Sequence, residues 1–278
     1  MGIGKNIGLV ATDLDGTLLR RDKTVSVADL EMLRQLGEKN IFRVVATGRN
    51  FRKTKEVITD DIPFDYVAFS SGAGIYDCRS QQLLYSRNIA VQTVNRLSEE
   101  LIGKGLSFFL FREVPMNAFS WYYRGRNSCE EFDRYFESHS GLTEKMPDSG
   151  RVLSGACQFL VIFKYPDQFL ELKDELGTVF DDLKILRASS PFETGYTWME
   201  IFHQDVSKGN AVRFLCDHLN IEREATVGIG NDYNDLDLLD FTSFSYLVEN
   251  GPEELKLRYR PAPSNENSAF SFCLQRHL

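Results

Sequence analysis

Continuous apolar runs alternate with helical patterns near both ends of this 278-residue chain, and this alternation constrains the fold more than any other feature. Residues 26–39 place leucines at helical spacing, with Ser26 as the expected N-cap. Strands that are buried on both faces and joined by helices are typical of parallel sheets. We therefore predict an α/β core, built on a parallel sheet with helices on both faces. The apolar runs of strand length are IGLVATD (7–13), FRVVAT (42–47), YVAFSS (66–71) and ATVGIG (225–230).

The middle of the chain follows another pattern, in which strand-like runs occur in succession between helices. Two such runs, at 107–114 and 118–126, are separated by a predicted turn near Pro115. Successive strands with intervening helices favour an α+β unit with an antiparallel sheet. We predict a core formed by 1–87 and 196–278, with an α+β domain inserted at 88–195.

Composition and charge restrict the partners of the chain. The sequence is 42% hydrophobic and 26% charged, with a formal net charge of -8 and a pI of about 5.2. An acidic surface repels phosphate backbones, which argues against nucleic acid as a partner. No apolar run approaches the roughly 18 residues of a membrane span. A small anionic substrate remains compatible with the composition, provided that local cations or a metal offset the overall field.

The cysteines and the N-terminus indicate the compartment. The chain has five cysteines, an odd number, at wide spacing and without a CxxC pair. This pattern argues against a disulfide framework or a zinc site and for a reducing compartment. The segment MGIGKNIGLV lacks the charged start, long apolar stretch and small-residue cleavage site of a signal peptide. We predict a cytoplasmic protein and leave its oligomeric state open.

The string DLDGTLL (13–19) carries the strongest chemical signal, because it directly follows a predicted buried strand. Asp13 and Asp15, at positions i and i+2 of an extended segment, point to the same side, and Gly16 permits the sharp turn that follows. Paired carboxylates beside a metal suit a nucleophile and a general acid. The alternative is a solvated Asp-Gly turn, which a bare DxD would favour and the whole string disfavours.

Two further segments offer groups that bind phosphoryl oxygens. In ATGR, Thr47 offers a hydroxyl, Gly48 lets the backbone approach closely, and Arg49 is a candidate substrate contact. Alone, this segment is no more than a common turn. In SKG, Lys208 is a candidate to neutralise charge on a transferring phosphoryl group. A solvated lysine at a helix start gains nothing from the helix dipole, so its position slightly favours a function.

The loop GNDYND (230–235) is the candidate metal site. It follows a predicted strand, and its Asp and Asn oxygens suit a hard cation such as Mg²⁺. Taken alone, a metal loop and a turn that caps the next helix are equally supported. All four segments lie where open α/β sheets bind ligands, at the carboxyl ends of predicted strands. Their combination therefore favours one coherent site.

Taken together, these motifs resemble those of the haloacid dehalogenase superfamily, in its Cof-type (IIB) phosphatase branch. DLDGTL resembles the first motif, the Thr of ATGR the second, the Lys of SKG the third and GNDYND the fourth, in order and spacing over the whole chain. SSGAGIYD (70–77) and PSNENSA (263–269) resemble further segments, with Ser71 where Asn is usual. The resemblance implies a Rossmann-like core, and the insertion at 88–195 sits where this branch carries its α+β cap domain.

The resemblance also implies a mechanism. Asp13 would attack phosphorus and form an aspartyl-phosphate, while Asp15 would protonate the leaving group and then deprotonate the hydrolytic water. Mg²⁺ would be held by the Asp13 carboxylate, the Asp15 carbonyl and the 231–232 segment. Thr47 and Lys208 would bind the transferring oxygens. The cap would close over the site and select the leaving group.

One position departs from the family pattern. The fourth motif usually reads G-D-x-x-N-D, with its first Asp on the metal, but this chain has Asn231 followed by Asp232. Either Asn231 ligates through its carbonyl oxygen, with one formal charge fewer, or Asp232 substitutes for it. The place directly after Gly230 favours Asn231. Asp235 matches the last Asp of the motif and would support the site by holding the ligands.

The motifs predict a magnesium-dependent phosphomonoesterase that hydrolyses small phosphorylated metabolites such as sugar, cofactor or polyol phosphates. Two alternatives stay open. A sugar phosphomutase is one, since related folds use the same paired aspartates, and a non-catalytic phosphate-binding homologue, supported only by Asn231, is the other. An aromatic and basic cluster at 121–126 is a candidate for binding a sugar or an aromatic ester, although a half-buried strand is the favoured interpretation.

Overall fold

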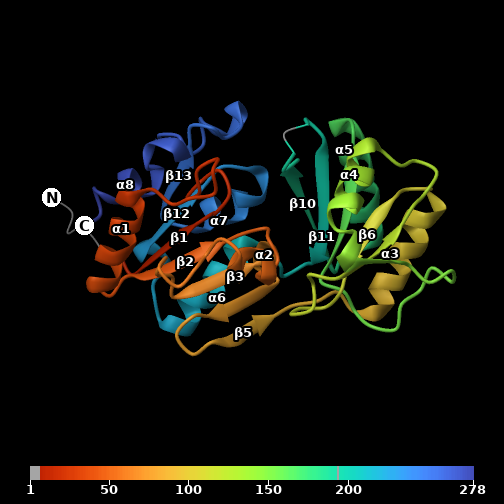
Figure 1. Cartoon of the computed structure of the whole chain (residues 1–278), viewed down its shortest axis with the longest axis horizontal. Helices are drawn as coiled ribbons and strands as arrows, with labels where there is room; N and C mark the ends of the chain where they lie inside the picture. Colours follow the sequence, from red (N-terminus) through yellow and green to blue (C-terminus); the bar gives the residue numbers. More distant parts are fainter. Residues whose placement is uncertain (1–6, 193) are drawn as a thin grey trace. The chain divides into compact units, whose positions relative to one another are not determined.

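The computed structural model describes residues 7–192 and 194–278, which form two compact units. Residues 1–6, the start of the segment that lacks the features of a signal peptide, lie outside the described residues. Among the described helices, none is both long enough and apolar enough to cross a membrane. The core unit comprises Met1–Tyr85 and Ser207–Leu278, and the inserted unit comprises Ser86–Val206 (Figure 1).

The described residues of the core unit form one eight-stranded sheet. Its strands are β1 (Leu9–Thr12), β2 (Phe42–Ala46), β3 (Tyr66–Phe69), β4 (Gly74–Asp77), β5 (Gln82–Ser86), β12 (Thr226–Gly230), β13 (Phe244–Val248) and β14 (Arg260–Ala262). They are arranged in the order β14-β13-β12-β1-β2-β3-β4-β5. Neighbours from β14 to β3 pair in parallel, and β4 turns back antiparallel to β3. The predicted parallel α/β core is therefore confirmed, since each of the four apolar runs contains a strand of this sheet.

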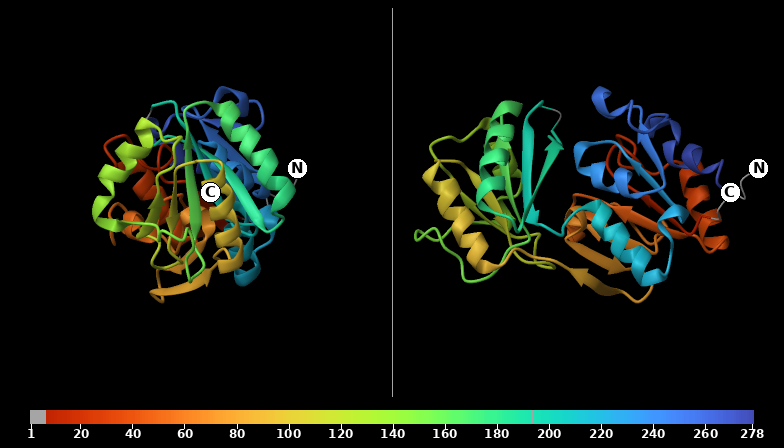
Figure 2. Two further views of the ribbon diagram at one scale, coloured as in Figure 1. Left: turned by 90° about the vertical axis from the view of Figure 1, so that its right-hand side faces the viewer. Right: turned by 180° about the vertical axis from the view of Figure 1, so that it is seen from behind.

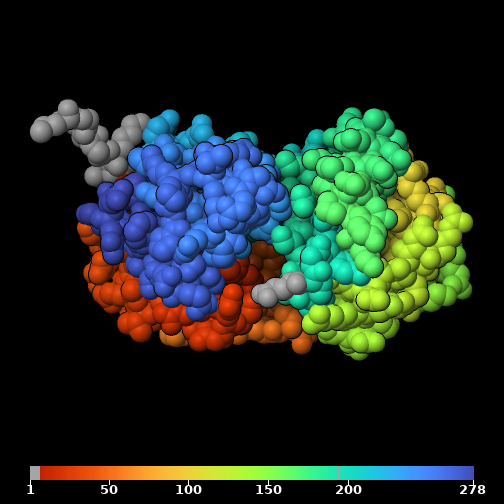
Figure 3. Space-filling view, turned by 90° about the horizontal axis from the view of Figure 1, so that it is seen from above, coloured from red at the N-terminus to blue at the C-terminus, as the bar shows by residue number. Residues whose placement is uncertain are grey.

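Helices from both the N-terminal and the C-terminal parts of the chain flank the sheet. They include α1 (Val27–Glu38), α2 (Phe51–Lys55), α6 (Lys208–Leu219), α7 (Leu236–Phe241) and α8 (Ala269–Leu274) (Figure 2). Ser26 Oγ accepts the N–H of Asp29 at 3.0 Å, which confirms the predicted N-cap of α1. The apolar face of α6 packs against the centre of the sheet. The red N-terminal and blue C-terminal segments lie side by side in this unit (Figure 3).

The inserted unit is an α+β structure, as predicted, and its described strands form one six-stranded sheet. Its helices are α3 (Val91–Gly103), α4 (Glu130–Ser138) and α5 (Pro166–Val179) among the described residues. Its strands are β6 (Phe108–Phe111), β7 (Ser120–Tyr123), β8 (Thr143–Lys145), β9 (Gln158–Phe163), β10 (Leu183–Ser189) and β11 (Thr197–His203). They lie in the order β10-β11-β9-β6-β7-β8 and pair antiparallel, apart from the parallel pair of β7 and β8.

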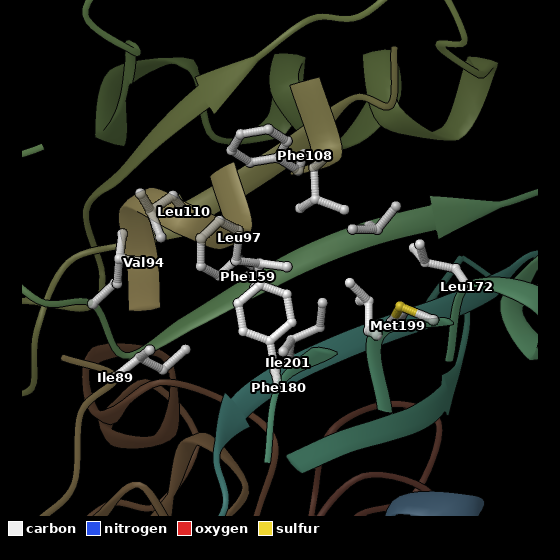
Figure 4. Close-up of a cluster of buried hydrophobic side chains, with 14 of the residues drawn as sticks. Ile89, Val94, Leu97, Phe108, Leu110, Phe159, Leu172, Phe180, Met199 and Ile201 are labelled. Atoms are coloured by element: carbon white, nitrogen blue, oxygen red, sulfur yellow. The ribbon is translucent and has the colours of Figure 1, made fainter. Parts of the chain in front are cut away.

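One apolar cluster holds the inserted unit together (Figure 4). Leu97 of α3, Phe159 of β9 and Met199 of β11 are among its buried members. Strand β11 also pairs with both β9 and β10, so it belongs to this sheet in its hydrogen bonds as well as in its packing. The inserted unit therefore extends to Val206, beyond the boundary at residue 195 that the sequence pattern suggests.

Candidate active site

Three neighbouring strands of the core sheet end at the same edge, and each is followed by a predicted site residue. Because β12, β1 and β2 are adjacent and parallel, Asn231, Asp13 and Thr47 follow their carboxyl ends. Main-chain pairing continues to this point, with the N–H of Asp13 donating to Ile229 O and that of Thr47 to Ala68 O, both at 2.8 Å. The fold thus brings residues from the first, second and fourth motifs to one edge.

Lys208 reaches this edge from the first turn of α6. Its side chain is 1% exposed, and its Nζ lies 2.6 Å from Oδ1 of Asp13 and 2.6 Å from Oδ1 of Asp235. Gly72, with a φ of +96°, lets the turn after β3 approach this helix closely, because a Cβ there would stand 2.5 Å from the carbonyl oxygen of Ser207. A larger residue at position 72 would displace the helix start, and Lys208 with it.

Burial sets the electrostatics of the Asp13–Lys208 pair. Burial disfavours the ionised form of Asp13 and, together with Asp235 and Asp15 nearby, outweighs the attraction of Lys208, so the pKa of Asp13 is raised to about 7. Burial also opposes the charge of Lys208, but the carboxylates of Asp13 and Asp235 outweigh it and raise the pKa of Lys208. Lys208 is therefore protonated at neutral pH, beside a carboxyl group that titrates near neutrality.

In the presence of a chelator, we expect Asp13 to make the protein less stable as the pH rises. The folded chain holds this proton up to about pH 7, whereas the unfolded chain loses it near the ordinary value of 3.8. Between the two values the folded state binds more protons, so the free energy of unfolding falls with rising pH, by up to about 1.4 kcal/mol per pH unit from this group. Urea unfolding of the wild type and Asp13→Asn measures the effect, because the variant lacks this titration. The expectation would be contradicted if the free energy of unfolding of the wild type, relative to that of the variant, increased with pH.

Asp15 is held by two cations. Arg49 binds it in a bidentate manner, from Nε to Oδ2 at 2.5 Å and from Nη2 to Oδ1 at 2.7 Å, and Lys23 Nζ lies 3.0 Å from Oδ1. Burial alone would raise the pKa of Asp15, but the hydrogen bonds and charges of Arg49 and Lys23 outweigh it, and the pKa is lowered. The sequence predicts a substrate contact for Arg49, and the structure shows it in an ion pair with the second aspartate of the first motif.

Thr47 and Gly48 border the same edge. Thr47 is buried, and its Oγ1 accepts the N–H of Arg49 at 3.1 Å, which orients the hydroxyl. A methyl group at Gly48 would lie 3.6 Å from the Asn234 amide and 3.7 Å from the Ser71 hydroxyl, which are ordinary contact distances. Gly48 therefore lies beside the site, but a small side chain at this position would not clash with its neighbours.

The loop after β12 places its two candidate ligands differently. Asp235 Oδ2 accepts the N–H groups of residues 231 and 232, at 2.8 and 3.0 Å, and so fixes the loop. The carboxylate of Asp232 caps the helical turn Tyr233–Asp235 and accepts the N–H of Tyr233 at 2.8 Å. One terminal atom of the Asn231 amide lies 3.1 Å from Oδ2 of Asp13 and 3.2 Å from the carbonyl oxygen of Asp15. Asn231 thus faces Asp13, while Asp232 caps a turn.

Comparison with known proteins decides the family. Residues 10–267 match the family model of haloacid dehalogenase-like hydrolases. The chain belongs to this family. The family predicted from the motifs is therefore confirmed, and the protein is a hydrolase.

Relatives and a solved structure resemble this haloacid dehalogenase-like hydrolase over most of its length. The HMP-PP phosphatase of Serratia proteamaculans is 26% identical, in a match that covers 89% of this chain and 86% of that protein. The 5-amino-6-(5-phospho-D-ribitylamino)uracil phosphatase YwtE of Bacillus subtilis is 24% identical, in a match that covers 97% of this chain and 97% of that protein. A phosphatase structure from Bacteroides thetaiotaomicron has a TM-score of 0.80 at 17% identity, and the match covers 100% of this chain and 97% of that one. The structural likeness confirms the fold.

The oxygen atoms that meet at the candidate active site of this haloacid dehalogenase-like hydrolase fit a hard divalent cation. Within residues 7–192 and 194–278, no group of three or more His, Cys, Asp or Glu side chains is placed to hold a metal ion. A cation would instead rest on the Asp13 carboxylate, the Asp15 carbonyl and the Asn231 amide oxygen. Their separations of 3.1 and 3.2 Å from the Asn231 atom are close to the roughly 3.0 Å between neighbouring oxygens around octahedral Mg²⁺. The set therefore fits Mg²⁺, with a single carboxylate in it.

Two residues of the site were not predicted from the sequence. Asn234 places its Oδ1 3.5 Å from Lys208 Nζ, and the repeated Asn-Asp of GNDYND is the signal that could have identified it. Ser71 has a φ of 54°, and its N–H donates to the carbonyl oxygen of Thr47 at 2.9 Å. The turn after β3 therefore positions the second motif through its main chain.

The C-terminal segment PSNENSA supports the first motif. Asn265 is buried, and its Nδ2 donates to the carbonyl oxygen of Leu19 at 2.8 Å. Its N–H donates to Asn250 Oδ1 at 3.3 Å, and Asn250 Nδ2 donates in turn to the carbonyl oxygen of Gly16 at 2.8 Å. These contacts hold both ends of the loop that follows Asp15.

The aromatic and basic cluster at 121–126 has structural partners within the inserted unit. Trp121 and Tyr123 pack against its apolar cluster, and Arg124 forms an ion pair with Asp133. These contacts support the interpretation of a half-buried strand.

Proposed function

We propose that this hydrolase is a Mg²⁺-dependent phosphomonoesterase that hydrolyses small phosphorylated metabolites through an aspartyl-phosphate intermediate. The observation that carries the proposal is the two-sided environment of Asp13. One of its carboxylate oxygens lies 2.6 Å from Lys208 Nζ, and the other lies 3.1 Å from the Asn231 amide. A carboxylate with a cation on one side and a metal donor set on the other is suited to attack an anionic phosphate ester.

The positions of the other groups suggest their roles. Asp13 attacks phosphorus through a carboxylate oxygen, the bond to the ester oxygen breaks, and Asp15 gives that oxygen its proton. Lys208 and Thr47 bind the transferring oxygens, over which the charge of the transition state is spread. Water then attacks the aspartyl-phosphate and passes a proton to Asp15, which restores both carboxyl groups. When bound by Asp13, Asp15 and Asn231, a divalent cation supplies charge that offsets the repulsion between nucleophile and substrate.

Asp15 acts as an acid only after Arg49 releases it. The bidentate pair engages both of its carboxylate oxygens and favours the ionised form. An anionic substrate offers Arg49 a competing partner, because a guanidinium group binds phosphate and carboxylate with the same fork of donors. The substrate contact predicted for Arg49 and the ion pair in the structure are then two states of one residue.

The relatives support a class of substrate. They are named as phosphatases of HMP-PP and of 5-amino-6-(5-phospho-D-ribitylamino)uracil. At 24 to 26% identity we extend only the class to this chain. Sugar phosphates and cofactor phosphates are therefore the first candidates.

Orthophosphate release from a panel of phosphate esters tests the proposal. We expect activity with millimolar Mg²⁺, its loss in EDTA, and its recovery when Mg²⁺ is restored, because the donor set consists of hard oxygens. Full activity in the chelator would exclude the metal from the reaction.

The same panel separates the two alternatives. Isomerised hexose phosphate without orthophosphate would support a phosphomutase, which must protect its aspartyl-phosphate from water. No product from any ester in Mg²⁺ would support a non-catalytic binding protein.

A further inference from the structure

The Asn231 amide stands among three oxygen atoms. One of its terminal atoms lies 3.1 Å from Oδ2 of Asp13, 3.2 Å from the carbonyl oxygen of Asp15 and 3.1 Å from Oγ1 of Thr17. On the other side, its second terminal atom lies 2.7 Å from the place of a Cβ on Gly16, so only glycine leaves room for the amide there. The amide is therefore confined, and it has two orientations related by half a turn.

The two orientations have opposite requirements. With the nitrogen inward, its N–H groups donate to the Asp13 carboxylate and the Asp15 carbonyl, and no cation is needed. With the oxygen inward, the amide oxygen meets the Asp13 carboxylate and the Asp15 carbonyl oxygen, and none of the three carries a hydrogen to donate. Such a cluster is repulsive unless a cation lies among the oxygens. The inward atom is thus a donor without a metal and a ligand with one.

Thr17 is able to serve both orientations. Its side chain is buried, and its hydroxyl oxygen lies 3.1 Å from the inward atom of the amide. There it can share one of the two hydrogens of an inward nitrogen, or donate its own hydrogen to an inward oxygen. A carboxylate at position 231 would not have this choice, because it offers only acceptors.

We propose that the Asn231 amide is a two-state element, whose NH₂ group replaces the metal in the apo protein and whose oxygen binds the metal after half a turn. The inference rests on the metal site of the proposed function and adds its regulation. An incoming Mg²⁺ must displace an internal donor, so its affinity is lowered while the apo site stays ordered. An acid at position 231 would reverse both properties, because it repels Asp13 without a metal and adds charge with one.

Asn231→Asp tests the proposal through stability and metal binding, with no need for a substrate. In EDTA we expect its melting temperature to lie about 2–6 °C below that of the wild type. In millimolar Mg²⁺ we expect the order to reverse. Calorimetric titration with Mg²⁺ should give a dissociation constant roughly tenfold lower than that of the wild type, because affinity follows the charge of the ligands.

Two further variants give each outcome a meaning. Asn231→Ala lacks both donor and ligand, so it should lose stability in EDTA and also bind Mg²⁺ more weakly than the wild type. Asp232→Asn is the matched control in the adjacent position, and its Mg²⁺ affinity should change far less than that of Asn231→Asp. If Asn231→Asp does not fold in EDTA but folds on addition of Mg²⁺, the reversal is present in its extreme form.

The proposal is overturned if Asn231→Asp equals or exceeds the wild type in stability in EDTA, or if its Mg²⁺ affinity is unchanged. A large loss of Mg²⁺ affinity in Asp232→Asn would overturn it too, because the ligand would then be the neighbour. These results are independent of turnover. Reversal of stability without phosphate release would refute only the proposed function, and phosphate release without reversal would refute only the role of the amide.

Discussion

Asp13→Asn is expected to lower kcat for phosphate release by about 10⁴-fold or more, the order found when a nucleophile is removed. The carboxylate sits at the end of β1, and its amide replacement is nearly isosteric, so packing in the core sheet is kept. Lys208 also keeps its contact with Asp235 at 2.6 Å. Initial rates in saturating Mg²⁺, combined with urea unfolding at neutral pH, measure both effects. Activity above roughly a hundredth of the wild type would remove Asp13 from the role of nucleophile.

Asp15→Asn is the matched control, because it changes the other aspartate of the same motif. Loss of an acid should depend on the leaving group, since an aryl oxide departs without a proton and an alkoxide does not. We expect a loss of about 10²- to 10⁴-fold for alkyl phosphates and a smaller one for aryl phosphates. Asp13→Asn should be equally impaired with both. A variant at Asp15 with the same loss for every ester would exclude it as the acid.

Sequence patterns predicted the strands that are buried on both faces at the centre of the core sheet. Every residue of β1, β3 and β12 is buried, and so are the last three residues of β2, because strands at the centre of a parallel sheet lack a solvent face. Elements at the edge were missed. Strand β5 is exposed over much of its length, and β14 has three residues, so neither carries a readable period.

The site was predictable as far as it follows from strand order. Motifs after neighbouring parallel strands must meet at one edge, which is why Asp13, Thr47 and Asn231 come together. The partners of individual side chains do not follow from this rule. The pairing of Arg49 with Asp15 depends on rotamers in two loops, and the turn capped by Asp232 depends on one local hydrogen bond.

The end of the inserted unit illustrates the same limit. The run 197–203 is largely apolar, like a core strand, and the third motif follows it closely. The sequence alone therefore does not decide whether this strand belongs to the core unit or to the inserted unit. Its hydrogen bonds to β9 and β10 decide the matter, and these pairings join segments that the local pattern does not connect.

Lys208→Met is expected to lower the free energy of unfolding by about 3–5 kcal/mol at neutral pH. Lys208 lies 2.6 Å from both Asp13 and Asp235, and all three side chains are buried. Methionine has a similar shape, but it leaves two carboxylates without their cation. The pKa of Asp13, already raised in the wild type, would then be raised further in the folded variant, so the deficit from this group is present above that pKa and disappears as the pH falls below it. Urea unfolding of variant and wild type across this range measures the deficit.

Asp235→Asn in the Lys208→Met background separates unpaired charge from lost packing. The asparagine removes one charge and keeps an oxygen that can accept the N–H groups of residues 231 and 232. If unpaired charge causes the deficit, the double variant is more stable than Lys208→Met, although Asp235→Asn alone weakens the wild type by breaking its ion pair. If lost packing is the cause, the two losses add. A Lys208→Met variant as stable as the wild type at neutral pH would show that Asp13 and Asp235 do not need a cation, and the electrostatic account of this site would then be wrong.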